Sequence, residues 1–220
     1  MSSCKELRAR GRETLGNTLF QVKWLFPLLA CLIINTISSV SSEFFLLGVI
    51  ISGALNVGLA SYFLMITRIH NTEKGLKTIF SGFTNNLGRN ITAGLFYMII
   101  WGILVFFAVL CLVTVKFIIP LFLLPIPVYA LVRFMLKYAM LFYVLADNPD
   151  YNVWQALSEA SALMKGQKWK FFKLQLSFIG WAFVSFITFG VGALWLAPYI
   201  QATNVAFYEE LKESNEYYVL

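Results

Sequence analysis

Six long apolar runs constrain this chain more than any other feature of its sequence. Each has about the length, roughly 20 helical residues, that crosses a hydrocarbon core about 30 Å thick. Their approximate bounds are Trp24–Val40, Phe44–Ile66, Ile91–Val115, Phe117–Leu145, Phe171–Phe189 and Val191–Phe207. None shows the alternating ten-residue pattern of a membrane β-barrel, so the runs predict helices. We therefore expect an all-α polytopic transmembrane bundle that forms a single domain over residues 1–220.

The composition excludes the two common alternatives to a membrane protein. Hydrophobic residues make up 59% of the chain and charged residues 13%, whereas soluble domains have about 45–50% and about 25%. A soluble core of this size could not bury so much apolar surface, and disorder requires the opposite composition. About 20 residues of mixed charge precede the first run, so we interpret that run as a retained helix rather than a signal peptide.

The basic residues predict the orientation of the spans. Fourteen of the 17 lysines and arginines fall in the N-terminal segment, in the two longer loops or near the C-terminus. Lys116 alone lies in an opposite loop, and Arg133 and Lys137 lie within the fourth run. By the positive-inside rule, both termini and the longer loops are cytoplasmic. The net charge of +6 is therefore interpreted as a membrane-topology signal, and nucleic acid is not expected as a partner.

Three cytoplasmic stretches share a plan, in which an amphipathic segment leads through a polar corner into a pair of apolar runs. The third is the clearest, because its apolar residues recur at helical spacing: Val153, Ala156, Leu157, Ala160, Leu163 and Met164. Asn152 with Gln155 predicts its N-terminal cap, and Gly166 predicts its end. Leu7, Leu15 and Leu19 mark the first stretch, and Leu76, Ile79, Phe80 and Phe83 mark the second. Three hairpins, each preceded by a cytoplasmic amphipathic helix, fit either a pseudo-repeat or ordinary interfacial connectors.

Several stretches carry a resemblance to a known family. They are Leu145–Pro149, Leu163–Gly166, Leu176–Trp181, Pro198–Tyr199 and Phe207–Leu211, with Tyr62–Arg68 and Phe80–Phe83 nearer the middle of the chain. Together they resemble the uncharacterised bacterial integral-membrane family called domain of unknown function 975. The resemblance implies a multi-span protein of a bacterial cytoplasmic membrane, typically Gram-positive. It implies no activity, substrate or site residues.

Arg133 and Lys137 are the sharpest candidates for a functional site. They are four residues apart on one predicted helix, so they share a face, and no acidic residue lies near them within the apolar runs. An ionisable group in a span is costly and marks a functional hypothesis. In one register Arg133 faces an aqueous cavity or an anionic ligand. In the other, both side chains extend to lipid phosphates at the cytoplasmic surface.

Polar groups in the last run give a second set of candidates. Gln201 and Asn204 are three residues apart beyond Pro198 and either line a polar path or bond between helices. Pro120, Pro125 and Pro127 predict a bend or break in the fourth run. A stripe of small residues, Ala54, Gly58 and Ser61, predicts close helix packing.

Enzyme signatures are absent, so no catalytic residue, metal or cofactor is expected. His70 is the only histidine and has Glu73 as its one near partner, which cannot build a zinc site or a catalytic triad. Asp147 and Asp150 flank Pro149, and we interpret them as helix-initiating residues.

These observations favour a non-enzymatic multi-pass protein of the cell membrane. Its expected role is binding, as a scaffold, an accessory subunit or an envelope-stress or immunity factor. Its expected partners are membrane lipids, anionic ones above all, and a membrane protein or a second copy of the chain. The alternative is a small permease or channel for an anionic or amphiphilic solute that uses Arg133, Lys137, Gln201 and Asn204.

Overall fold

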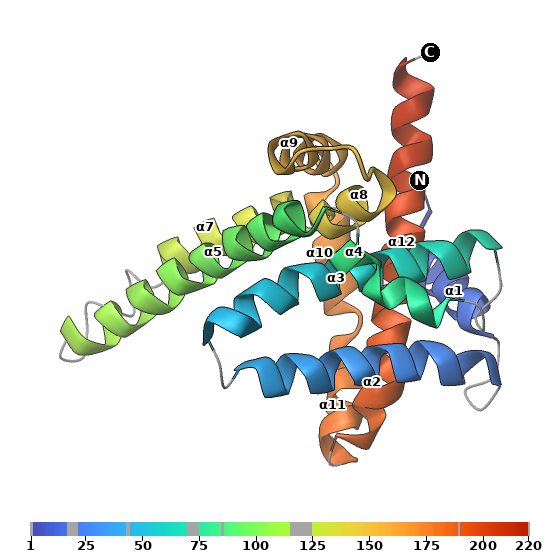
Figure 1. Cartoon of the computed structure of the whole chain (residues 1–220), viewed down its shortest axis with the longest axis horizontal. Coiled ribbons are helices and arrows are strands. Elements are labelled where there is room, and N and C mark those ends of the chain that lie inside the picture. Colours follow the sequence, from blue (N-terminus) through green and yellow to red (C-terminus); the bar gives the residue numbers. More distant parts are fainter. Residues whose placement is uncertain are drawn as a thin grey trace.

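The computed structural model describes residues 2–16, 22–42, 45–69, 75–84, 86–114, 125–188 and 190–219. Helices and short turns account for these residues, and no strand occurs among them. The helices are α1 (Cys4–Leu15), α2 (Val22–Ser42), α3 (Phe45–Ile69), η1 (Leu76–Phe80), α4 (Ser81–Thr84), α5 (Leu87–Thr114), α7 (Pro125–Lys137), α8 (Leu141–Asp147), α9 (Val153–Leu163), α10 (Lys168–Leu176), α11 (Ile179–Ile187) and α12 (Val191–Val219) (Figure 1). The predicted all-α fold class is confirmed.

The predicted apolar runs become helices, but fewer of them qualify as membrane spans. In the part of the chain that the structure describes, two stretches are long and apolar enough to cross a bilayer: Tyr129–Asp147 and Lys168–Ile187. Lys23–Ser38 and Leu87–Ile100 are apolar but shorter. Residues 43–44 and 115–124, which belong to the predicted second, third and fourth runs or to the turns between them, lie outside the described residues. Six spans are therefore not confirmed.

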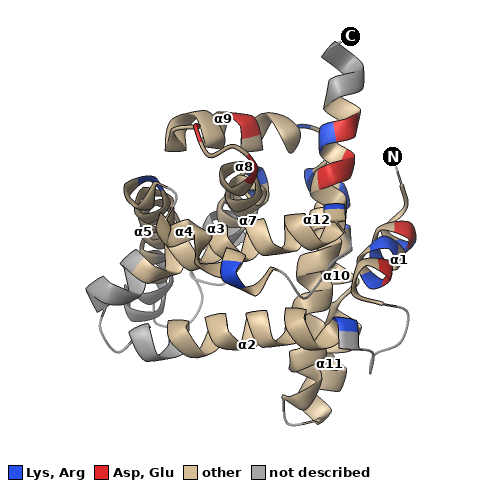
Figure 2. Ribbon diagram, turned by 45° about the vertical axis from the view of Figure 1, so that its right-hand side comes forward, with Lys and Arg blue, Asp and Glu red and all other residues tan. Residues whose placement is uncertain are grey.

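Helix α2 runs crosswise to the hairpin of α11 and α12. In both ribbon views α12 stands upright while α2 lies across it, and the two helices are in contact (Figures 1 and 2). The apolar helices therefore do not form a bundle of parallel rods, as the expected transmembrane bundle implies. Hydrophobic periodicity fixes which face of a helix is buried, and it leaves the crossing direction to side-chain packing.

The three amphipathic stretches form the connectors that the sequence predicts: α1, η1 with α4, and α9. The Asn152 capping box with Gln155 is present, and all six apolar residues of the third stretch are buried. Each connector is followed within three residues by a residue with positive φ: Gly16 at 103°, Asn86 at 51° and Gly166 at 78°. Such a φ reverses the chain at each corner and suits glycine or asparagine. Leu19 lies outside the described residues.

Each connector packs against the last helix of the preceding unit. Helix α9 contacts α8, and η1 with α4 contacts α3, where a Cβ on Gly58 would overlap the backbone of Ile79. Helix α1 contacts α12, so the first connector closes the ring against the end of the chain. The predicted close packing at Ala54 and Gly58 is confirmed, since Gly82 also meets the Ala54 backbone. This cyclic arrangement favours the pseudo-repeat over unrelated interfacial connectors.

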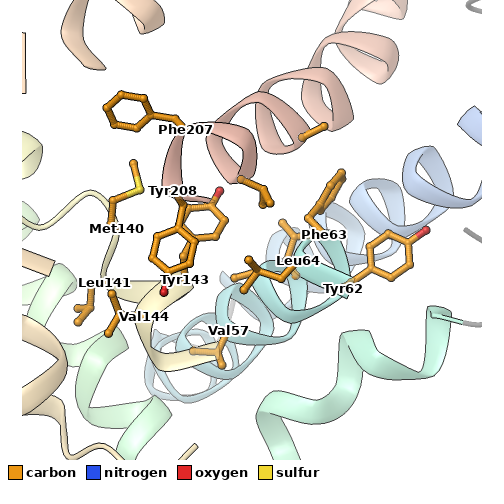
Figure 3. Close-up of a cluster of buried hydrophobic side chains, with 14 of the residues drawn as sticks. Val57, Tyr62, Phe63, Leu64, Met140, Leu141, Tyr143, Val144, Phe207 and Tyr208 are labelled. Atoms are coloured by element: carbon orange, nitrogen blue, oxygen red, sulfur yellow. The ribbon is translucent and has the colours of Figure 1, made fainter. Parts of the chain in front are cut away.

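The core lies where α3, α8 and α12 converge. Each of these helices contributes large aromatic side chains that are almost fully buried: Tyr62, Phe63, Tyr143, Phe207 and Tyr208 (Figure 3). The rings of Tyr143 and Tyr208 stack with centroids 5.9 Å apart. Aromatic pairs in this arrangement contribute about 0.5–1.5 kcal/mol beyond the burial of their area. This packing fixes the three helices against one another, and in each helix a charged residue comes shortly after the aromatic one: Arg68, Asp147 and Lys212.

Candidate functional site

A cluster of charged residues ties the ends of α3, α8 and α12 together. Asp147, the last residue of α8, accepts a hydrogen bond at Oδ1 from Arg68 Nη1 at 2.6 Å. Its Oδ2 accepts from Lys212 Nζ at 2.7 Å and from the Tyr208 hydroxyl at 3.1 Å. Arg68 also donates from Nε to Glu209 Oε1 at 2.9 Å. This end cluster therefore joins three segments that are far apart in the sequence.

The end cluster is built around a buried carboxylate. The Asp147 side chain is 7% exposed, whereas that of Arg68 is 43% exposed. A buried carboxylate requires compensating charge and hydrogen bonds, and Asp147 receives three donors. The interpretation of Asp147 as a helix-initiating residue is wrong, because it ends α8 instead of starting a helix. Asp150 lies in the turn before Asn152, the N-cap of α9.

Arg89 holds the loop that follows Asp147. Its guanidinium donates to the backbone carbonyls of Leu145 at 3.1 Å, Asn148 at 3.0 Å, Pro149 at 2.6 Å and Tyr151 at 3.2 Å. Carbonyls at the C-terminus of a helix lack partners within that helix, so an arginine can satisfy several of them at once. This role places the start of α5 against the end of α8. Sequence reasoning counted Arg89 only as a cytoplasmic charge.

A second ion pair fixes the N-terminal helix. Glu210 Oε1 accepts from Lys170 Nζ at 2.9 Å and from the backbone N–H of Ser2. Burial alone would raise the pKa of Glu210, but the Lys170 ammonium and the Ser2 N–H outweigh burial and hold that pKa below its usual value. The same residue of α12 thus anchors α10 and the segment before α1.

The predicted basic candidates lie on α7. Arg133 is exposed, and its Nη1 is 3.3 Å from the Tyr129 hydroxyl. Lys137 is half-buried, with Nζ 4.8 Å from the ring centroid of Tyr138. Neither has an acidic partner among the described residues. Their role in binding a ligand or a lipid headgroup stays a prediction.

The predicted amide candidates lie in contacts between helices. Gln201 Oε1 accepts from the Tyr143 hydroxyl at 2.6 Å, and Asn204 Oδ1 accepts from Gln175 Nε2 at 2.8 Å. These bonds connect α12 to α8 and to α10. No hydrogen bond between described residues joins the amides to Arg133 or Lys137. Their predicted role in lining a polar path likewise remains untested.

The fourth run contains an interruption that the prolines do not predict, and the predicted bend or break at the prolines stays a prediction. Pro125 and Pro127 stand in the first turn of α7, where proline is tolerated, and residues 115–124, which include Pro120, are outside the described part. The break between α7 and α8 lies at residues 138–140. There the Tyr97 hydroxyl donates to the Tyr138 carbonyl, which compensates for the interrupted helix.

The residues that the structure describes contain no group of three or more histidine, cysteine, aspartate or glutamate side chains that could hold a metal ion. His70, the one histidine, lies outside them. The end cluster is internally compensated, so its geometry suits a structural junction between three helices.

Comparison with known proteins gives a family and no closer relative. No curated protein and no solved structure matches the chain. One family model, described as "Protein of unknown function (DUF975)", matches residues 1–215. The match covers nearly the whole chain, so it includes the connectors, the aromatic core and the end cluster. The resemblance seen in the sequence is confirmed, and this chain belongs to the DUF975 family.

Proposed function

We propose that this chain is a non-enzymatic multi-pass protein of the bacterial cell membrane that acts by binding, as a scaffold, an accessory subunit or an envelope-stress or immunity factor. One observation carries the proposal. Large apolar side chains of α5 and α11 are exposed. Helix α11 has no charged residue and α5 has only Arg89, at its start, whereas charged residues gather on α1, α10 and the C-terminal half of α12 (Figure 2). Exposure of so much apolar surface to water is unfavourable, whereas contact with lipid acyl chains is favourable.

The exposed apolar surface is extensive. On α11, Phe183 is 68% and Phe186 is 84% exposed, and on α5, Ile99 and Phe106 are similarly exposed. Exposed apolar patches on soluble monomers rarely exceed a few hundred Å², and larger ones mark contacts with proteins or membranes. Lys168–Ile187, one of the two stretches that qualify as spans, contains α11. A bilayer is the surrounding that accounts for both facts.

The same proposal includes the number of membrane spans and the side of the membrane on which the termini lie. It comprises six spans in three hairpins, with both termini in the cytoplasm, as the distribution of basic residues predicts. The crosswise course of α2 makes the first hairpin the most informative one to test (Figure 1). The proposed partners are anionic lipids together with a membrane protein or a second copy of the chain.

Two measurements test the proposal. Alkaline carbonate extraction of membranes from cells expressing the full chain should leave the protein in the pellet. Single cysteines, placed in a chain without Cys4, Cys31 and Cys111, should then report sidedness through a membrane-impermeant thiol reagent. We expect cytoplasmic labelling at Arg10 and at Lys165, and external labelling at Ser42. Extraction into the supernatant would contradict the membrane assignment, and cytoplasmic labelling at Ser42 would remove the first hairpin from the spans.

The exposed position of Arg133 favours one alternative function, a small permease or channel for an anionic or amphiphilic solute. A single cysteine at position 133 separates the two functions. Labelling from outside, or from both sides, would mean that water reaches the middle of this segment, which would favour the permease. Labelling from the cytoplasm only, or no labelling, would favour the binding protein.

A further inference from the structure

The face formed by α10 and α11 is suited to one phospholipid molecule. Trp169, Lys173 and Leu176 follow one another at helical spacing along α10, and all three are exposed. Ile179, Phe183 and Phe186 continue the same spacing along α11 and are also exposed. A two-residue turn separates the two helices, and the backbone N–H of Phe178 donates across it to the Gln175 carbonyl at 3.1 Å. We refer to these six residues as the α10–α11 stripe; Lys165, in the turn before α10, and Lys168, the first residue of α10, lie at the same end.

One end of the stripe carries uncompensated positive charge. Residues 165–187 include four lysines and no acidic residue. Lys170 is paired with Glu210, whereas Lys165, Lys168 and Lys173 have no acidic partner among the described residues. Lysines in this setting attract an anion, each contributing about 1 kcal/mol at an anionic membrane surface.

An exposed aromatic side chain holds one of these lysines in place. Lys173 Nζ is 5.5 Å from the Trp169 ring centroid, and Trp169 stacks on Phe172 with centroids 5.4 Å apart. Trp169 is nevertheless 62% exposed. An exposed tryptophan beside lysine is typical of the headgroup level of a bilayer, because the indole is both apolar and polar.

The other end of the stripe has the length of one acyl chain. From Leu176 to Phe186 the helices rise by about 15 Å, at about 1.5 Å per residue. An acyl chain of a lipid in one leaflet has about this length. The lysines and the apolar side chains are therefore spaced as the phosphate and the acyl chains of a lipid in one leaflet.

We propose that the α10–α11 stripe binds an anionic glycerophospholipid of the cytoplasmic leaflet. Lys165, Lys168 and Lys173 bind the headgroup phosphate, and Leu176, Ile179, Phe183 and Phe186 contact the acyl chains. The inference rests on the proposed membrane function and adds to it, for the anionic lipids proposed there, the residues that bind one lipid molecule. Net negative charge on the headgroup distinguishes this lipid from a zwitterionic one of equal chain length.

The test uses the full chain reconstituted in phosphatidylcholine vesicles, with spin-labelled phosphatidylglycerol or spin-labelled phosphatidylcholine as the probe. Electron paramagnetic resonance measures how much of each lipid is motionally restricted by the protein. We expect phosphatidylglycerol to be preferred. The triple variant K165Q/K168Q/K173Q should lower that preference at this site by on the order of tenfold. The matched control K5Q/K23Q/K77Q removes the same charge from exposed lysines elsewhere and should keep most of the preference.

Each contrary outcome has a distinct meaning. No restricted signal for either lipid would contradict the proposed membrane function itself. A restricted signal without preference for phosphatidylglycerol, or an equal loss in both triple variants, would overturn only the lipid site. Inorganic phosphate that abolishes the preference, where chloride at equal ionic strength does not, would assign the lysines to a soluble phosphate. The variant Phe183→Asn should weaken restriction of phosphatidylglycerol, and no change there would also overturn the lipid assignment.

Discussion

The buried carboxylate of Asp147 is expected to contribute to the free energy of unfolding. The substitution Asp147→Asn removes the negative charge that Arg68 and Lys212 share, yet it preserves the shape of the side chain. Hydrogen bonds to charged groups contribute about 1.5–3 kcal/mol each, so we expect a loss of about 2 kcal/mol in the free energy of unfolding. Thermal unfolding of the purified chain in detergent measures it. Glu159→Gln, at an exposed position of α9, should change stability by less than about 0.5 kcal/mol.

The lowered pKa of Glu210 predicts a dependence of stability on pH. Because the pKa is lower in the folded chain than its usual value of 4.5, ionised Glu210 stabilises the fold at neutral pH. That contribution is lost as the pH falls from about 4.5 through the lower, folded value. The variant Glu210→Gln should therefore show a shallower decline of melting temperature in this acidic range than the natural chain. Glu213→Gln, at an exposed position one turn onward, should retain the full decline, and a Glu210→Gln profile as steep as the natural one would refute the assignment.

Among the elements, α1 depends on a close approach to α12. A Cβ on Gly11 would lie 2.8 Å from the backbone nitrogen of Thr203, so Gly11→Ala should push α1 away and cost about 1–3 kcal/mol. Gly88→Ala offers a control of opposite sign, since nothing lies within 4 Å of its Cβ and alanine favours a helix. Unfolding measurements should separate the two variants. Faster thiol labelling of Cys4 in Gly11→Ala would report the displaced helix, and unchanged labelling and stability would argue against this packing.

The connectors could be predicted from the sequence because the signals that define them are local. Amphipathic spacing, the Asn152 capping box and the Gly166 corner are local signals, and local signals act within a few residues. The break between α7 and α8 had no such signal, because it depends on the Tyr97 hydroxyl reaching the Tyr138 carbonyl from another helix. The prolines at 120–127 therefore gave no sign of the interruption at 138–140.

At the scale of the whole molecule, the cyclic packing predicts that the chain can be opened elsewhere. Ser2 bonds to Glu210, so a short Gly/Ser linker from Ser214 to Ser2 would span about one turn of helix. A circular permutant that joins these ends and begins at Glu73, between α3 and η1, should fold and show the thermal unfolding of the natural chain. A permutant that begins at Leu59, inside α3, should not fold. Equal failure of both permutants would contradict the closure of the ring by α1.

The helical class, the amphipathic connectors with their corners, the distribution of basic residues and the family can all be predicted from the order of residues in the chain. These properties follow from composition, from helical period and from residues adjacent in the chain. The course of α2 across α12, the contacts of Gln201 and Asn204, and the end cluster at Asp147 become visible only in the folded chain. Asp147 meets Arg68 and Lys212 from segments 79 and 65 residues away. Periodicity states which face is buried but not which helix covers it, since that choice depends on side chains packing together in three dimensions.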